Sequence, residues 1–258
     1  MGVAAINQVI GKDIMNVLSS AVIHIAFVVG AVLGSGSVFA AEPATAAAIN
    51  KAVNTTEISA HQVVEVTTER VMKIITEAQE YYDQDPQRFY REIETVLGEV
   101  VDFDSFARGV MGKYASKRSY MALKTDEEKK QFRARMVRFS QIFRDGLVQT
   151  YAKGLLAFNG NKIEVLPANG NENNSSGSVT VVQHIYGGAE KPYEVHYKLR
   201  KNRSGEWKLR NVTIEAVNLG KVYQSQFYSA AKQYQGDIDK VIDNWSVDPT
   251  AQADNKAS

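Results

Sequence analysis

The spacing of the apolar side chains changes near residue 160, and this change constrains the fold more than any other feature of the chain. From residue 61 to 155 apolar residues recur every three or four positions, which is typical of helices that bury one face. From residue 162 to 214 they alternate with polar residues in short runs separated by glycine and asparagine. Helical spacing then returns. We therefore predict an α+β fold in which a curved antiparallel sheet of about four strands packs against several helices.

Capping residues and proline divide the first part into four helices. The first covers about residues 61–82 and ends before Pro86, which opens a second helix to about residue 100. Asp102 or Asp104 can cap a short third helix. Thr-Asp-Glu-Glu at residues 125–128 is a capping box, and it begins the longest helix. That helix carries a broad apolar face formed by Phe132, Met136, Phe139, Phe143, Leu147, Tyr151 and Leu155.

Four strands are predicted at residues 162–168, 179–186, 193–200 and 207–214. The third shows the strand period clearly, because its apolar residues occupy every second position. One face of the sheet is therefore expected to be covered by helices and the other to face water. Two more helices are expected after the sheet, one through residue 235 and one carrying Ile238, Val241, Ile242 and Trp245.

The first 40 residues resemble a secretory signal peptide. Residues 17–33 are almost wholly apolar, and Val38-Phe39-Ala40 ends the segment with a small-residue cleavage site, so the predicted cut falls after Ala40. The positive region is weak because Lys12 is offset by Asp13, which leaves an uncleaved membrane anchor as an alternative. With no cysteine in the chain, stability has to come from packing alone. We expect an exported, periplasmic protein.

Four regions follow from these boundaries. They are a signal peptide at residues 1–40, a flexible linker at 41–60, one domain at 61–245 and a disordered tail at 246–258. The 30 basic residues nearly balance the 29 acidic ones, so no basic field for nucleic acid is expected. We expect a monomer.

Candidate catalytic groups are few. Residues 109–114 lack the spacing and the hydroxyl of a phosphate-binding loop, and Gly34-Ser35-Gly36 lies in the leader. His184 and His196 can be cross-strand partners but lack a third ligand, so no metal and no cofactor are predicted. Asp102 and Asp104 are more typical of helix caps than of an acid–base pair. Four basic residues near the sheet are either a solvated face or a site for phosphate or an acidic partner: Lys198, Arg200, Lys208 and Arg210.

Three short segments carry a resemblance to a known family. They are Trp207-Lys208-Leu209, the corner from Ile214 to Leu219 and Tyr223-Gln224-Ser225-Gln226-Phe227. A further match covers residues 101–114, with an aspartate–aromatic turn, an alanine–arginine pair and a glycine-x-tyrosine. Over most of residues 65–245 the chain resembles the MlaC-type periplasmic phospholipid-binding proteins of the toluene-tolerance auxiliary transport family. It departs from the family pattern at Ala216 and Asn218, where glycine and serine are favoured.

The resemblance implies a cone-shaped fold, similar to the NTF2-like and cystatin-like folds, with an apolar pocket between helices and sheet. It implies a soluble, non-enzymatic carrier that takes phospholipid between an outer-membrane lipoprotein complex and an inner-membrane ABC transporter and so maintains outer-membrane lipid asymmetry. Direction and head-group preference stay open. Core packing is the ordinary role of each apolar residue; on the resemblance, the predicted lipid contacts are Phe103, Phe106, Val110, Met111, Tyr114, Phe139, Phe143, Tyr197, Val217, Leu219 and Tyr223.

Two other classes of protein stay open at this point. An isomerase or dehydratase on the same kind of fold would need a carboxylate or histidine inside the pocket, and His184 or Asp102 is the candidate. A structural envelope protein would instead dock on partners through its basic face.

Overall fold

The computed structural model describes residues 58–156, 162–168, 177–186 and 191–247. The predicted signal peptide, nearly all of the linker and the tail from residue 248 lie outside these residues. Within the described part, no helix is both long and apolar enough to cross a bilayer.

The helices of the first half begin where their capping residues predict. Ser59 forms a capping box with Gln62, Asp85 accepts a hydrogen bond from Arg88 N, and Asp102 accepts one from Ser105 N. Thr125 and Glu128 form the predicted capping box of the longest helix, with bonds of 2.9 and 3.1 Å. These caps open α2 (Ala60–Tyr81), α3 (Pro86–Val100), α4 (Phe103–Met111) and α6 (Asp126–Leu156).

The predicted third helix is shorter than expected, because Gly112 has a φ of 53° and ends α4 after Met111. A 3-10 turn, η1 (Gly112–Ala115), and a short helix, α5 (Lys117–Met121), follow before α6. The sequence pattern had not separated these two elements.

Five strands form one antiparallel sheet in chain order. They are β1 (Lys162–Val165), β2 (Ser178–Tyr186), β3 (Tyr193–Lys201), β4 (Trp207–Ile214) and β5 (Val217–Asn218). The first four confirm the predicted strands. The fifth has only two residues, too few to show a period in the sequence.

The chain turns sharply from β4 through β5 into α7 (Leu219–Gln233). Glu215 takes a positive φ of 51° in that turn. Asn218 then caps α7 by accepting a hydrogen bond from Lys221 N at 3.0 Å, and it also binds Asn211 at 2.9 Å. Asparagine therefore does the capping that a serine would do at this position.

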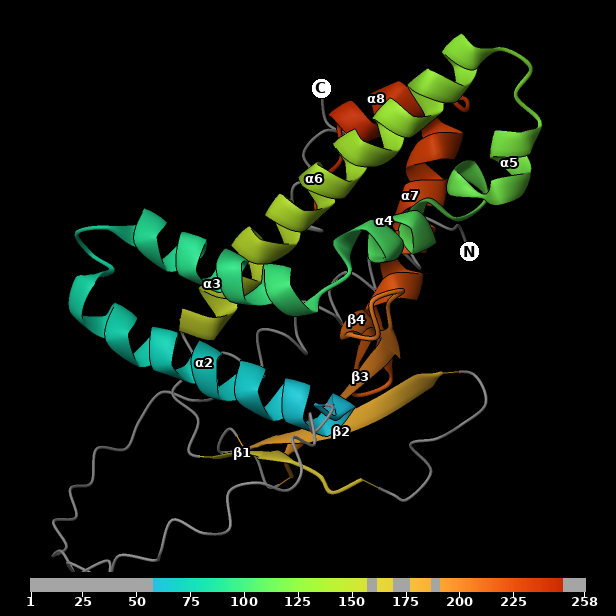
Figure 1. The fold of residues 1–258 in the computed structure, drawn as a ribbon. Coiled ribbons are helices and arrows are strands. Elements are labelled where there is room, and N and C mark those ends of the chain that lie inside the picture. Colours follow the sequence, from blue (N-terminus) through green and yellow to red (C-terminus); the bar gives the residue numbers. More distant parts are fainter. Residues whose placement is uncertain (1–57, 157–161, 169–176, 187–190, 248–258) are drawn as a thin grey trace, which may run out of the picture.

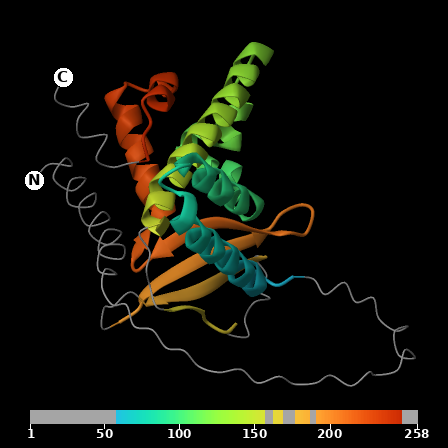
Figure 2. The same cartoon turned by 90° about the vertical axis from the view of Figure 1, so that its left-hand side faces the viewer.

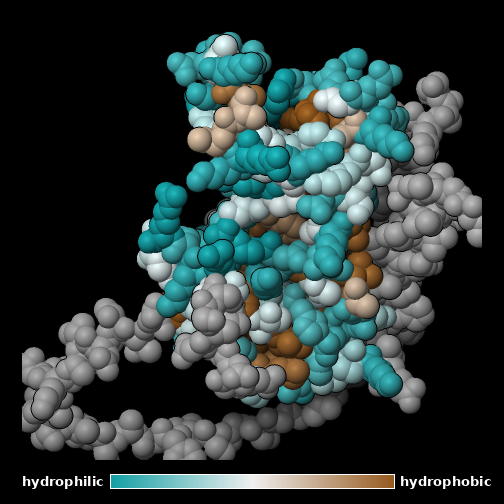
Figure 3. All heavy atoms as spheres, turned by 90° about the vertical axis from the view of Figure 1, so that its right-hand side faces the viewer, coloured by the Kyte–Doolittle hydropathy of each residue, from teal (hydrophilic) through white to brown (hydrophobic). Residues whose placement is uncertain are grey.

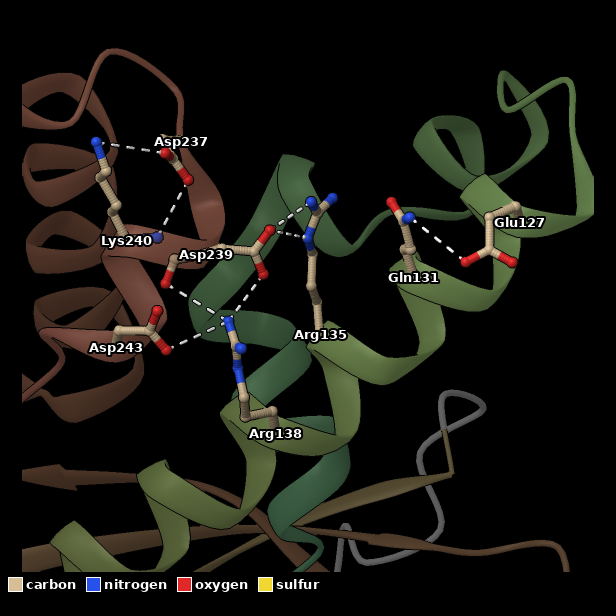
Figure 4. A network of polar contacts seen from close by, with 8 residues as sticks. All are labelled: Glu127, Gln131, Arg135, Arg138, Asp237, Asp239, Lys240 and Asp243. Carbon is tan, nitrogen blue, oxygen red and sulfur yellow. Dashed lines mark hydrogen bonds and ion pairs between the residues drawn. The ribbon is translucent and has the colours of Figure 1, made fainter.

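Ion pairs attach the last helix, α8 (Ile238–Asp243), to α6. Arg135 donates twice to Asp239 Oδ2, and Arg138 donates to Asp239 Oδ1 at 2.8 Å (Figure 4). Arg138 also lies 3.5 Å from Asp243. The hydrogen bond from Arg135 is the main reason that the pKa of Asp239 is lowered. The pairs are partly exposed, so they add orientation more than stability.

Figures 1 and 2 show the helices gathered on one side of the sheet. α2 lies across β1 and β2, whereas α4 and α7 contact β4. α6 and α8 extend away from the sheet beside α7 (Figure 1).

An aromatic cluster forms the centre of the helical layer. Phe139 stacks on Phe143 at 5.7 Å and meets Phe227 and Trp245 edge-on at 5.0 and 5.2 Å. Phe139, Phe143 and Phe227 are fully buried. Such side chains contribute most of the stabilisation of a core of this size.

At Gly112 the packing leaves no room for a side chain. A Cβ there would overlap Tyr228 Oη, and the hydroxyl is held in place because Lys113 N donates to it at 3.0 Å. The backbone of Gly112 also has a positive φ that other residues rarely adopt.

Gly112→Ala should therefore lower the free energy of unfolding by about 1–3 kcal/mol. Gly109→Ala is the matched control, because it lies in α4 with no atom within 4 Å of an added Cβ. The control should be neutral or stabilising by up to about 1 kcal/mol. Urea denaturation of both variants measures the difference in their free energies of unfolding. Equal destabilisation by the two substitutions would contradict the requirement for glycine at position 112.

Candidate functional site

The inner face of the sheet is almost entirely apolar. Directly paired residues of an antiparallel sheet point to the same side, so the register defines one continuous surface. Gln183 and Lys201 are its polar members. The others are Ile163, Val165, Val179, Val181, Ile185, Tyr193, Val195, Tyr197, Leu199, Trp207, Leu209, Val212, Ile214 and Val217.

A bulge in β4 keeps this surface continuous. Leu209 pairs with Leu199, but Asn211 pairs with Lys198, so Arg210 has no partner across the strand. Leu209 and Val212 consequently both face inward although they are three residues apart. Arg210 instead forms an ion pair with Asp102 at 2.9 Å, next to the start of α4.

Two separate clusters of buried side chains cover this surface. The larger lies among α3, α4, α6, α7, α8 and the C-terminal half of α2, and the smaller lies beneath the first turns of α2 on β2 and β3. Ala60 and Val64 of α2 meet Val179, Val181 and Leu199 in the smaller cluster.

A seam runs between these two clusters, and the side chains along it are only half-buried. On the sheet side, Tyr197 belongs to the small cluster, whereas its cross-strand neighbour Val212 belongs to the large one. The C-terminal end of α6 comes down over the sheet here (Figures 1 and 2). We define the seam by six half-buried residues: Tyr151, Leu155, Tyr197, Val212, Ile214 and Val217.

The surface of the molecule also shows breaks in its polar cover. Figure 3 shows hydrophobic side chains emerging in small patches between polar ones on the face that it draws. Apolar surface is therefore partly open to solvent on this side.

The polar groups beside the seam are neutral. Tyr197 Oη donates to Gln183 Oε1 and Gln183 Nε2 donates to Thr68 Oγ1, both at 2.8 Å, which links β3, β2 and α2. Burial raises the pKa of Tyr197. The hydroxyls of Tyr151 and Tyr223 lie 2.7 Å apart, and burial raises the pKa of Tyr151 to about 12. These groups add hydrogen bonds but no charge at neutral pH.

Most of the predicted lipid contacts lie in the larger cluster. Eight of them are buried there: Phe103, Phe106, Val110, Met111, Phe139, Phe143, Leu219 and Tyr223. Tyr114 and Val217 pack against that cluster, and Tyr197 packs against the smaller one. Val217 and Tyr197 therefore lie on the seam, whereas the eight buried residues are packed within the larger cluster.

The residues considered for catalysis lie elsewhere. Asp102 caps α4 and pairs with Arg210, and Asp104 accepts a hydrogen bond from Ser140 Oγ at 2.5 Å. His184 lies on the outer face of the sheet opposite Glu194. None of these groups faces the seam. Within the described ranges, no three His, Cys, Asp or Glu side chains are grouped to hold a metal.

The sequence had allowed His184 and His196 to be cross-strand partners, but the register of the sheet does not pair them. His196 is opposite Val182, and Glu194 contacts both rings, at 3.5 Å for His184 and 2.5 Å for His196. These contacts lower the pKa of Glu194, chiefly through the hydrogen bond to His196.

Sequence reasoning missed the polar pair Thr68 and Gln183. Gln183 is only 2% exposed and occupies an inward position between Val181 and Ile185. The available signal was Gln183 itself, because it is an amide at a position of the strand where the alternation predicts an apolar side chain.

Comparison with known proteins gives matches of three kinds. The family model described as MlaC protein matches residues 65–247. The toluene tolerance protein Ttg2D of Pseudomonas putida is 32% identical over 186 residues, which are 72% of this chain and 79% of that protein. A phospholipid-binding protein from Ralstonia solanacearum, solved with a phospholipid, shares the fold with a TM-score of 0.55 and 18% identity, over 72% of this chain and 93% of the other.

Tyr151→Phe should flatten the pH dependence of stability in the alkaline range. The pKa of Tyr151 is about 12 in the folded chain and about 10 when unfolded, so only the unfolded state releases the proton between these values. Below about pH 10 Tyr151 therefore does not change how the free energy of unfolding depends on pH. As the pH rises from about 10 to 12, Tyr151 lowers that free energy by roughly 1–2 kcal/mol. Urea denaturation across this range measures the slope. Tyrosines other than Tyr223, which loses its hydroxyl partner in the variant, contribute equally to both proteins, so equal slopes would contradict the prediction.

Proposed function

This chain belongs to the MlaC family, and we propose from this premise that it is a carrier of phospholipid whose acyl chains lie along the seam between the helices and the sheet. The fold is also that of a protein solved with a phospholipid bound.

The observation that carries this proposal is the half-buried apolar seam. The inner face of the sheet is mostly apolar, yet the two clusters above it do not join over Tyr197, Val212, Ile214 and Val217. A hydrocarbon chain laid there would complete the cover of the sheet. The neutral hydroxyls beside it impose no charge on a fatty tail.

The size of the hydrophobic effect explains why such a carrier is needed. Each buried methylene contributes about 0.8 kcal/mol, so exposing two chains of about sixteen carbons to water costs on the order of 25 kcal/mol. A carrier has to replace the bilayer with apolar protein surface and to release the lipid without a chemical step. Shape and mobility accomplish this, and no catalytic group or cofactor is required.

We extend the proposal to the route of the lipid. The predicted leader would export the chain to the periplasm, where it would carry lipid between an outer-membrane lipoprotein complex and an inner-membrane ABC transporter. In this role it would maintain the lipid asymmetry of the outer membrane. Family membership supports this route.

Organic extraction of the purified protein followed by mass spectrometry tests the proposal directly. We expect diacyl phospholipid to co-purify in a fixed ratio to protein. An empty protein, or a bound molecule without acyl chains, would contradict the carrier function.

Val217→Glu should abolish this lipid retention while the protein stays folded. Val217 is a half-buried seam residue on β5, and a carboxylate there would meet the lipid tail. Val137→Glu is the matched control, because Val137 lies on α6 and is 59% exposed. Mass spectrometry and circular dichroism of both variants are the measurements. Wild-type lipid content in the folded Val217 variant would overturn the assignment of the seam.

A further inference from the structure

A basic segment without any acidic residue connects α4 to α6. Between Asp104 and Asp126 the chain has five cationic side chains and no carboxylate. All five are exposed: Arg108, Lys113, Lys117, Arg118 and Lys124.

These cations differ from most other charges of the molecule in having no acidic partner. Several arginines elsewhere pair with carboxylates, as Arg88 does with Glu92 and Arg144 with Glu94. Among the described residues, no carboxylate lies within ion-pair distance of the five cations. The acidic first turn of α6 follows Lys124 directly. There Glu128 accepts hydrogen bonds from the backbone N–H groups of Lys124 and Thr125, and Asp126 pairs with Lys129.

An apolar side chain projects from the middle of this segment. Met121, at the end of α5, is 70% exposed, which is the highest value among the exposed large hydrophobic residues described. We call Lys113, Lys117, Arg118, Met121 and Lys124 the α5 tip.

The α5 tip is held firmly on α6. Tyr120 packs against Phe132 with ring centroids 5.4 Å apart, and Arg133 Nη1 donates to Tyr120 Oη at 2.7 Å. Figure 1 shows α5 at the outer edge of the molecule, far from the sheet. Figure 3 looks onto this side of the molecule and shows mainly polar surface there, with small apolar patches.

We propose that the α5 tip docks the protein on a membrane surface that carries anionic lipid headgroups, with Met121 entering the headgroup layer. Unpaired cations around one apolar side chain are the composition that binds such a surface. A protein partner is less well matched, because a standard interface buries about 800 Å² on each side, and α5 has only five residues. Electrostatic binding to lipid requires charge and access but no matching shape.

The expected affinity is weak, and this suits a protein that has to leave again. Each cation near an anionic surface strengthens binding about fivefold, and the attraction is screened by salt. The docking proposal goes beyond the proposed carrier function and does not depend on the seam, since none of the tip residues lines it.

Flotation of the purified chain with lipid vesicles tests the proposal. We expect the protein to float with phosphatidylcholine vesicles that contain phosphatidylglycerol, at low salt, and not with phosphatidylcholine alone. Lys117→Ala with Arg118→Ala should lower the partition coefficient by about 25-fold, and added salt should have the same effect. Met121→Ser should weaken binding further.

The matched control is Lys198→Ala with Arg200→Ala, which removes two exposed cations from the outer face of the sheet. It should leave flotation unchanged. All variants share the same N-terminal segment, so a contribution of the leader cancels in the comparison. If the wild type does not float, docking by the tip is overturned. That result is expected if the tip binds an acidic protein instead of a membrane. Equal losses in both double variants also overturn docking by the tip.

Lipid extraction from the same variants separates this proposal from the carrier function. The Lys117 and Arg118 variant should keep its co-purified lipid although it no longer floats. Val217→Glu should float normally although it carries no lipid. Loss of both properties in either variant would show that the tip and the seam are not independent, and would contradict the docking site as proposed.

Discussion

The apolar inner face of the sheet has to be kept from water, and the helical layer does so incompletely. Burial of apolar surface is the main force that holds such a domain together, so an uncovered row of inward-facing residues is costly. Here the cover is divided between the small cluster beneath the first turns of α2 and the larger cluster around the aromatic rings of α4, α6 and α7. The seam between them is the part of the fold that stability alone would have closed. A ligand made of hydrocarbon is the natural complement of such a surface.

The order and type of the elements could be predicted because the local signals agree with the final structure. Asp85 before Pro86, the capping box at Thr125 and the alternation from Tyr193 to Leu199 each specify a boundary or a period within a few residues. The two-residue strand β5 and the break at Gly112 could not be found in this way. The strand β5 is too short to show a period and pairs with the end of β4 just before it, whereas the break at Gly112 depends on contact with the distant Tyr228.

The site was harder to predict than the fold, since a pocket wall and a core have the same composition. Phe139 and Phe143 are predicted lipid contacts, and in the structure each is fully buried and stacked on the other, which is a position that a core residue also takes. Val217 and Tyr197 lie on the seam because of the register of the sheet, which the sequence does not specify. Gln183 and Thr68 bond to each other across 115 positions, and no local pattern links them.

The interior is divided into two clusters, but α2 spans both of them. Its first turns rest on aliphatic side chains of β2 and β3 and on the bonds through Gln183, whereas Ile75 and Ala78 farther along pack in the larger cluster. One continuous helix therefore joins the two sides of the seam. A vessel built in this way widens only if that helix tilts or bends, so both of its walls respond together to the length of the contents.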